Sequence, residues 1–383
     1  MRHKSAESKS NVNRRSRGPV RYAVVGLGYI SQAAVLPAFA HASSNSVLTA
    51  LVSGDATKLK RLGRKYKVSN LYRYEDFDEC LESGEVDAVY IALPNNLHRE
   101  YSVRAAQAGI HVLCEKPMAV TSAECQQMID AARSNGVRLM IAYRLHFEAA
   151  NLRAVEIARS GKLGRLRVFN SLFTMSVKPG DIRLKAELGG GTLYDIGIYC
   201  INAARYLFRD EPHEVFAASA QNGDRRFREV DEMSAAILRF PDDRLAMFTS
   251  SFGATDTAVY QIVGTNGHLR LEQAYEYAEA LDLETTIRDK TTRRTFPKRD
   301  QFAPELVYFS DCVLKRKPPE PSGEEGLADV RIIEALYESA ATGRTVALPP
   351  YRRGKRPSKN LEMKRPPVRM PELVHARPPS ITK

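Results

Sequence analysis

The chain has 383 residues, 43% of them apolar, with five cysteines and no tryptophan. This length exceeds that of most single domains, so we predict two. No stretch approaches the ~20 apolar residues of a membrane span, so we expect no membrane contact. The cysteines form no CxxC pair, which predicts reduced thiols and no metal site. They are Cys80, Cys114, Cys125, Cys200 and Cys312.

The net charge of +12 is concentrated at the two ends of the chain. Residues 1–20 carry +5 and residues 351–383 carry +8, so the rest of the chain carries −1. A near-neutral body without a recognition motif argues against nucleic-acid binding. We predict a disordered basic extension at 1–18 and a disordered, proline-rich basic tail at 349–383, for which weak polyanion binding stays open. The early arginines precede no apolar export segment, so we expect a cytoplasmic protein.

Short apolar segments alternate with helical segments from residue 19 to residue 143. The strand candidates are "RYAVVGLG", "SVLTALVS", "DAVYIALP", "HVLCEKP" and "RLMIAYR". Continuous apolar strands between amphipathic helices predict a parallel sheet covered on both faces, as in a Rossmann domain. Asp55 precedes the helical segment "ATKLKRLGRKYK" and is its predicted N-cap.

The pattern changes in residues 144–348. Helical segments at 151–161 and up to Phe208 are followed by strand candidates without long helices between them, from "EVFAASA" to "ALDLETTI". Two more helices are expected near 302–316 and 324–342. This order predicts an α+β domain built on a largely antiparallel sheet.

The segment "GLGYIS" stands between the first strand and the first helix of the Rossmann domain. A close glycine turn there lets backbone N–H groups and the helix N-terminus approach a pyrophosphate. Ser31 replaces the third glycine of the usual motif, and a plain tight turn is the alternative interpretation. The predicted cofactor contacts are Gly26, Leu27, Gly28, Tyr29 and Ile30.

The end of the second strand predicts NADP rather than NAD. NAD enzymes place a carboxylate there for the ribose hydroxyl, whereas this chain has Ser53, which does not repel a 2′-phosphate. Lys58 could supply positive charge. Asp55 argues against NADP, although its capping role needs no ligand.

Two later strands end in further candidates, because ligands bind at the carboxyl edge of such sheets. Lys116, held before a proline, could stabilise an alkoxide or lower the pKa of a neighbouring phenol; a surface lysine is the alternative. His98 is either a cofactor contact or a surface residue at a helix start. The cofactor candidates here are Leu93, Pro94, Asn95, His98, Glu115 and Lys116.

The segment "GGGTLYDIGIY" opens the helix that runs to Phe208. Asp195 and Tyr199 are four residues apart, so they share a helix face. A tyrosine beside a lysine can act as the acid/base of hydride transfer, with a carboxylate as orienting group. A glycine helix entry with a capping Asp and a half-buried Tyr explains the spacing equally well.

Together, "GLG", "EKPMA" and "GGGTLYDIGIY" resemble the Gfo/Idh/MocA oxidoreductase family, and the branch that contains glucose–fructose oxidoreductase. The similarity extends over about residues 20–348 and includes "DAVYIALPNNLH" and "RLMIAYRLHF". It implies a Rossmann domain followed by an open-faced domain whose sheet mediates oligomerisation, with the active site between them.

The resemblance also assigns roles. Lys116 is similar to the family's catalytic lysine and Asp195 to its substrate-site aspartate. Tyr199 stands where most members have His, as in the glucose–fructose oxidoreductase branch, which implies that it is the acid/base. Ser53 and Lys58 match positions that hold the NADP phosphate. Further residues that would approach cofactor or substrate are Arg144, Arg183 and Tyr277.

The sequence thus predicts an NADP-dependent carbohydrate oxidoreductase that acts on an aldose or ketose between its domains. Lys116, Asp195 and Tyr199 are the predicted catalytic residues, and Arg183 and Tyr277 would help to bind the sugar. The expected assembly is a homodimer or homotetramer formed through the C-terminal sheet. Two alternatives stay open: a dehydrogenase whose NAD(P) dissociates in each cycle, and a non-catalytic NADP-binding sensor or scaffold.

Overall fold

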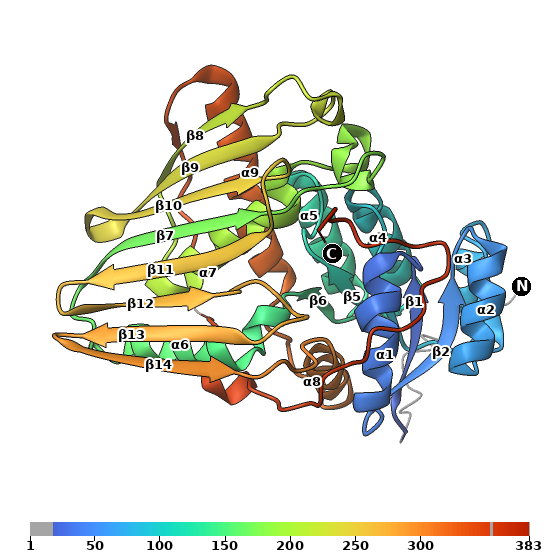
Figure 1. The fold of residues 1–383 in the computed structure, drawn as a ribbon. Helices are drawn as coiled ribbons and strands as arrows, with labels where there is room; N and C mark the ends of the chain where they lie inside the picture. The colour runs from blue at the N-terminus through green and yellow to red at the C-terminus, as the bar shows by residue number, and fades with distance from the viewer. Residues whose placement is uncertain (1–17, 353–354, 383) are drawn as a thin grey trace, which may run out of the picture.

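The computed structural model describes residues 18–352 and 355–382, so the predicted basic extension lies outside the described residues except for Gly18. Within the described ranges, two β-sheets lie side by side with helices packed against them (Figure 1). This arrangement confirms a Rossmann domain followed by a domain with a largely antiparallel sheet. No helix of these ranges is long and apolar enough to cross a membrane.

The first sheet is parallel and has the strand order β3-β2-β1-β4-β5-β6. Its strands point side chains alternately to two faces, and each face is buried in its own hydrophobic core. Every predicted strand is present, and β3 is an additional edge strand. The strands are β1 Val20–Val25, β2 Ser46–Val52, β3 Asn70–Tyr72, β4 Ala88–Ile91, β5 His111–Glu115 and β6 Leu139–Ala142.

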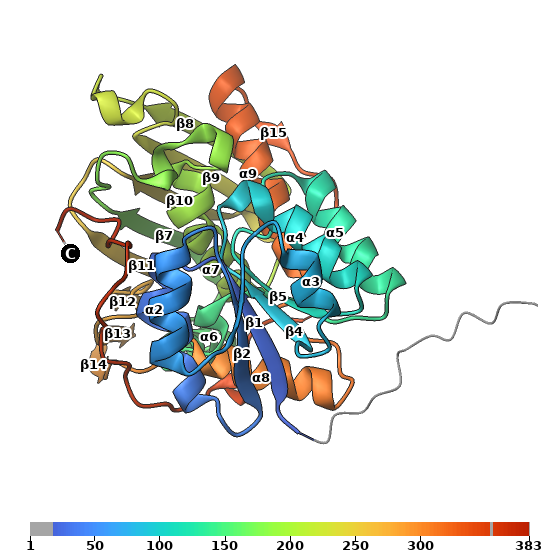
Figure 2. The same ribbon diagram turned by 90° about the vertical axis from the view of Figure 1, so that its right-hand side faces the viewer.

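Helices cover both faces of this sheet (Figure 2). One face packs against α3 (Phe77–Glu82), α4 (His98–Gln107) and α5 (Ser122–Ser134). The other packs against α1 (Leu36–Ala38), α2 (Ala56–Tyr66) and α8 (Ala303–Leu314). The sequence placed the helix near 302–316 in the second domain. Instead α8 returns to the first sheet, where the Ser310 hydroxyl is hydrogen-bonded to that of Tyr22 (2.7 Å), because a parallel sheet needs both faces covered.

The second sheet has nine strands in the order β14-β13-β12-β11-β7-β10-β9-β8-β15. All neighbours in it are antiparallel except β7 and β10. The short β15 and the strongly charged β14 were not predicted. The strands are β7 Leu166–Thr174, β8 Glu214–Ala220, β9 Met233–Phe240, β10 Arg244–Ser251, β11 Thr257–Gly264, β12 Gly267–Glu272, β13 Leu281–Ile287, β14 Lys290–Phe296 and β15 Val346–Ala347.

Helices cover one face of the second sheet and leave the other open. The covering helices are α6 (Ala149–Arg159), α7 (Ile198–Phe208) and α9 (Gly323–Thr342). On the open face, Ile237 of β9 pairs with Phe216 of β8 and with Met247 of β10. These three side chains are each more than a third exposed, so they form an apolar row across three strands.

A buried charge network anchors α7 beneath the open-faced sheet. Arg205 of α7 is fully buried and pairs with Glu211 (2.7 Å), Glu325 (2.8 Å) and Asp329 (2.6 Å). Arg356 from the C-terminal tail joins it through Glu211 at 2.6 Å. Buried charges are stable only when they are paired, so this network holds α7, α9 and the tail together.

The C-terminal tail differs from the prediction that residues 349–383 are disordered. Val374 is buried against the first domain, and Ser380 forms a β-bridge with Val177 of the second. The tail contains few apolar residues, as its composition indicated. Its described residues nevertheless pack on the two domains, because Arg356 enters the buried carboxylate network and Val374 enters the core.

We predict an acid-sensitive stability that depends on His146. Burial lowers the pKa of His146 to about 4, so below the ordinary value the unfolded chain binds a proton that the folded chain does not. The free energy of unfolding should therefore decrease as the pH is lowered, by about 1.5 kcal/mol from this residue between pH 6.5 and pH 5. Urea unfolding at both pH values measures it.

The control for this prediction is His146→Gln, whose amide can still donate to Asn202, as Nε2 of His146 does at 2.8 Å. Burial also lowers the pKa of His111 to about 4. His111 is present in both proteins, so it contributes equally to their pH dependence and does not affect the difference between them. An equal pH dependence of the two proteins would contradict the assignment.

Candidate active site

The nucleotide loop after β1 has the geometry that its glycines predict. Gly26 has φ 94°, and a Cβ there would lie 2.4 Å from the carbonyl oxygen of Ala92, so only glycine fits. A Cβ at Gly28 would meet nothing within 4 Å, so open space adjoins the loop at the start of the first helix. A close turn, free space and a helix N-terminus suit a dinucleotide pyrophosphate, and the loop therefore fits NADP.

At the end of β2, the structure clarifies the conflict between Ser53 and Asp55. Ser53 is buried, and its hydroxyl accepts a hydrogen bond from the Asp55 backbone N–H (3.2 Å). One carboxylate oxygen of Asp55 caps α2 by accepting from the amides of Thr57 and Lys58. The other oxygen accepts from Nδ1 of His375 in the tail (2.8 Å). Both oxygens of the carboxylate are thus already engaged.

Two predicted cofactor contacts after β4 are held by other parts of the protein. Asn95 Nδ2 donates to the carbonyl oxygen of Gly189 (2.8 Å), which ties the nucleotide domain to the glycine segment. His98 is fully buried, with its ring nitrogens 2.8 and 3.0 Å from the carbonyl oxygens of Pro117 and Leu93. Because His98 is fully buried, it is not the surface residue of the alternative interpretation. It fixes the loop that follows Lys116.

The glycine segment brings Asp195 to the domain boundary. A Cβ at Gly190 would lie 2.4 Å from the carbonyl oxygen of Arg183, so only glycine fits at this position. The helix that follows opens as a π-helical turn, Leu193–Gly197, rather than as the α-helix we expected. π-Turns often occur at functional sites because they re-aim side chains.

Lys116 and the Asp195–Tyr199 pair meet between the two domains. Lys116 Nζ donates to the Asp195 backbone oxygen (2.8 Å) and lies 3.5 Å from its carboxylate. The same ammonium lies 4.7 Å from the ring centroid of Tyr199. Arg183 holds the other carboxylate oxygen of Asp195 at 2.7 Å through Nε. Four predicted site residues therefore form one cluster.

Charges in this cluster keep its ionisable groups charged. Burial raises the pKa of Asp195, but Arg183 and Lys116 outweigh burial and hold that pKa below its ordinary value. Burial lowers the pKa of Lys116, and the nearby Tyr199 and Asp195 more than reverse this effect. The aspartate is thus a carboxylate and the lysine an ammonium over the neutral pH range.

Arg144 is a second cation in contact with Tyr199. It is buried, its Nη2 donates to the Tyr199 hydroxyl (3.3 Å), and its guanidinium lies 5.2 Å from that ring. Tyr277, which we expected in the sugar pocket, stacks near Arg144 and donates to the hydroxyl of Tyr29 in the nucleotide loop (3.3 Å). It therefore lies beside the cofactor loop.

Three partners of the cluster were not predicted from the sequence. Gln301 and the backbone oxygen of Tyr275 accept hydrogen bonds from Arg144, and Asp181 pairs with Arg183 at 3.2 Å. Of these three, only Asp181 could have been suspected from the sequence, because it lies two residues before Arg183.

Glu115, a predicted cofactor contact, accepts a hydrogen bond from the Tyr90 hydroxyl (2.7 Å), and burial raises the pKa of Glu115.

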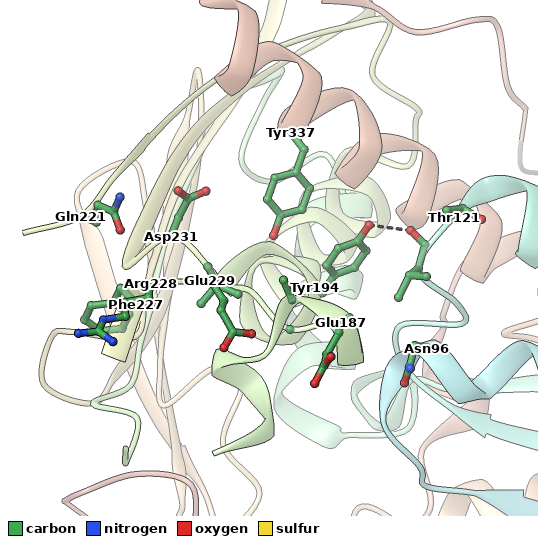
Figure 3. Close-up of a pocket in the computed structure, with 15 residues that line it drawn as sticks. Asn96, Thr121, Glu187, Tyr194, Gln221, Phe227, Arg228, Glu229, Asp231 and Tyr337 are labelled. Carbon is green, nitrogen blue, oxygen red and sulfur yellow. Dashed lines mark hydrogen bonds between the residues drawn. The ribbon is translucent and has the colours of Figure 1, made fainter. Parts of the chain in front are cut away.

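A pocket of about 510 Å³ adjoins the glycine segment, whose Gly189, Gly190 and Tyr194 border it (Figure 3). Tyr194, Tyr337 and Glu187 line it, and the Tyr194 hydroxyl donates to the Val120 carbonyl. Lys116, Asp195 and Tyr199 do not line it, so it is separate from the cluster.

Among the described residues, no group of three or more His, Cys, Asp and Glu side chains could hold a metal ion.

Comparison with known families agrees with this geometry. Residues 20–143 match the model of an oxidoreductase family with an NAD-binding Rossmann fold, and residues 151–270 match the GFO/IDH/MocA C-terminal domain. The chain belongs to the Gfo/Idh/MocA family of oxidoreductases. The resemblance drawn from "EKPMA" and "GGGTLYDIGIY" is confirmed.

Several members of the Gfo/Idh/MocA family resemble the chain over most of its length. D-xylose 1-dehydrogenase [NADP(+)] of Haloarcula marismortui is 33% identical over 86% of this chain and 93% of its own. The aldose–aldose oxidoreductase of Caulobacter crescentus, solved with glycerol, is 39% identical over 86% of this chain and all of its own, with a TM-score of 0.82. A 3-ketoreductase of Actinomadura kijaniata, solved with NADP and TDP-benzene, is 29% identical over 84% and 98%, with a TM-score of 0.77.

We predict that Gly190→Ala disrupts the cluster. The new Cβ would collide with the Arg183 carbonyl and displace Arg183 from Asp195. Thermal or urea unfolding should show a loss of about 1–3 kcal/mol in the free energy of unfolding. Gly18→Ala, where a Cβ meets nothing within 4 Å, is the control. Equal stability of the two variants would contradict the prediction.

Proposed function

We propose that the protein is an NADP-dependent sugar oxidoreductase that acts on a CH–OH group of an aldose. The observation that carries the proposal is the contact of one ammonium, Lys116, with both Asp195 and Tyr199 at the boundary of the two domains. Two family members whose names include an aldose or xylose support the substrate class.

Tyr199 is the proposed acid/base. During oxidation the phenolate form of Tyr199 takes the proton of the sugar hydroxyl and becomes the phenol, and during reduction the phenol returns that proton. Lys116 and Arg144 lie against its ring, and their charges stabilise negative charge that develops on oxygen during the transfer. Hydrogen bonds already hold both cations in place, so they can stabilise this charge without rearrangement.

Asp195 is the proposed orienting group. Its carboxylate is charged and only partly exposed, so it can accept hydrogen bonds from sugar hydroxyls at a fixed position. Arg183 holds that carboxylate and would also face the sugar.

NADP, held by the loop at Gly26–Ile30 and by Ser53 and Lys58, would supply the hydride acceptor or donor. The neighbouring backbone and side chains of Pro94 and Asn95 would border its nicotinamide end. The retained hydroxyl at Ser53 and the engaged carboxylate of Asp55 support NADP over NAD.

Activity assays with a panel of aldoses and ketoses, each with NADP and NAD, test the proposal. Tyr199→Phe and Lys116→Met should each lower kcat on the order of 100-fold, because the proton transfer or the charge stabilisation is lost. NADPH binding, measured by its fluorescence, should survive both substitutions.

Tyr194→Phe is the matched control, since the Tyr194 hydroxyl bonds to the Val120 carbonyl outside the cluster. Full activity of both Tyr199→Phe and Lys116→Met would refute the mechanism. NADPH binding without turnover on any sugar would favour a non-catalytic sensor instead.

The open face of the second sheet supports a homodimer. The apolar row of Phe216, Ile237 and Met247 is exposed in the single chain, and burying it against a second copy would remove it from water. Light scattering after gel filtration should give a dimer or tetramer for the natural chain and a monomer for Ile237→Glu.

Lys290→Glu, on β14 at the far end of the same sheet, should leave the assembly unchanged. A natural chain that is monomeric at micromolar concentration would contradict the dimer.

A further inference from the structure

The last described residues of the chain are linked to the nucleotide loop through the side chain of Gln32. We name residues 371–382 the C-terminal strap. The backbone N–H of Val374 donates to the side chain of Gln32 (2.7 Å), whose amide donates back to the Val374 carbonyl (2.9 Å). The same Gln32 amide donates to the carbonyl of Leu27 in the loop (2.9 Å). Gln32 and Val374 are both buried, so this is a built contact.

The strap then crosses to the second domain. Figures 1 and 2 show it passing α1 and α2 and returning to the end of the second sheet. There the Pro379 carbonyl accepts from the amide of Lys178 (2.9 Å), and the Ile381 amide donates to the Ser176 carbonyl (2.7 Å). The Ser380 hydroxyl donates to Asp256 (2.9 Å). The strap is thus fastened on both sides of the domain boundary.

Between these attachments the strap places His375 on Asp55. The His375 ring donates, at 2.8 Å, to the carboxylate oxygen of Asp55 that does not cap α2. This hydrogen bond lowers the pKa of Asp55, and the hydrogen bond from the Lys58 amide lowers it further. His375 has φ 46°, a left-handed conformation that residues other than glycine rarely adopt, so its position is imposed by its neighbours.

Asp55 stands two residues beyond Ser53, near the strand end at which this fold binds the adenosine ribose. A free carboxylate there binds a ribose 2′-hydroxyl and repels a 2′-phosphate. In this chain the helix cap uses one oxygen and His375 uses the other, so both oxygens of the carboxylate already accept hydrogen bonds from the protein.

We propose that the C-terminal strap completes the NADP site: it closes over the nucleotide loop to slow release of the cofactor, and His375 occupies Asp55 so that the 2′-phosphate is accepted. This inference rests on the proposed function, in which the loop binds NADP. His375 is a specificity-determining residue and takes no part in the chemistry.

Dissociation constants and release rates of NADPH and NADH, measured by nicotinamide fluorescence, test the proposal. A chain that ends at Met370 should release NADPH at least tenfold faster than the full chain. His375→Ala should weaken NADPH binding about tenfold and leave NADH binding unchanged or tighter, because the freed carboxylate repels the 2′-phosphate but can accept a hydrogen bond from the 2′-hydroxyl. Arg369→Ala, an exposed charge on the same tail, should behave as the natural chain.

The outcomes separate the strap from the proposed function. If the full chain binds neither nucleotide, the proposed function fails. If the full chain binds NADPH but the shortened chain releases it equally fast or binds it more tightly, the strap proposal is wrong and the proposed function stands. An equal loss of affinity for NADPH and NADH in His375→Ala overturns the specificity role. Because His375 is exposed, this variant should fold, and it tests that role even if the shortened chain does not fold.

Discussion

The carboxylate of Asp195 is the point on which the two domains and the cluster both depend. One cation, Lys116, reaches it from the end of a strand of the first sheet, and another, Arg183, reaches it from the second domain. A partly buried carboxylate with two cations is stable, whereas the loss of either cation leaves charge uncompensated. The same contacts that join the two domains at this point therefore also fix Asp195 and, one helical turn later, Tyr199 beside Lys116.

Patterns that are local in sequence predicted the architecture well. Alternating apolar strands and amphipathic helices correctly gave the parallel sheet, and Asp55 caps α2 as its position indicated. Clustered strands after Phe208 gave the antiparallel sheet. The strand β14 was missed because "KTTRRTF" is charged and exposed, so it has no apolar alternation to detect.

Contacts between distant segments could not be predicted from one sequence. His98 has no signal that distinguishes a surface helix start from a fully buried ring held by two carbonyls. The return of α8 to the first sheet depends on which surface remains uncovered. The tail was misjudged because its composition is that of disordered segments, while its order comes from a few anchors, Arg356 and Val374, whose partners lie far away in sequence. Lys116, Asp195 and Tyr199 could be grouped only by resemblance, since spacing alone left a structural explanation open.

The Arg205 network has a consequence for the order in which the protein is made. Arg205 emerges from the ribosome 120 residues before Glu325 and still longer before Arg356. Until those residues are synthesised, the helix that carries Tyr199 has a guanidinium without most of its carboxylate partners, and it cannot be buried at acceptable cost. The first sheet also waits for α8. We therefore expect that neither domain reaches its final packing until nearly the whole chain has been synthesised. A chain whose translation stops early would not contain one correctly folded domain.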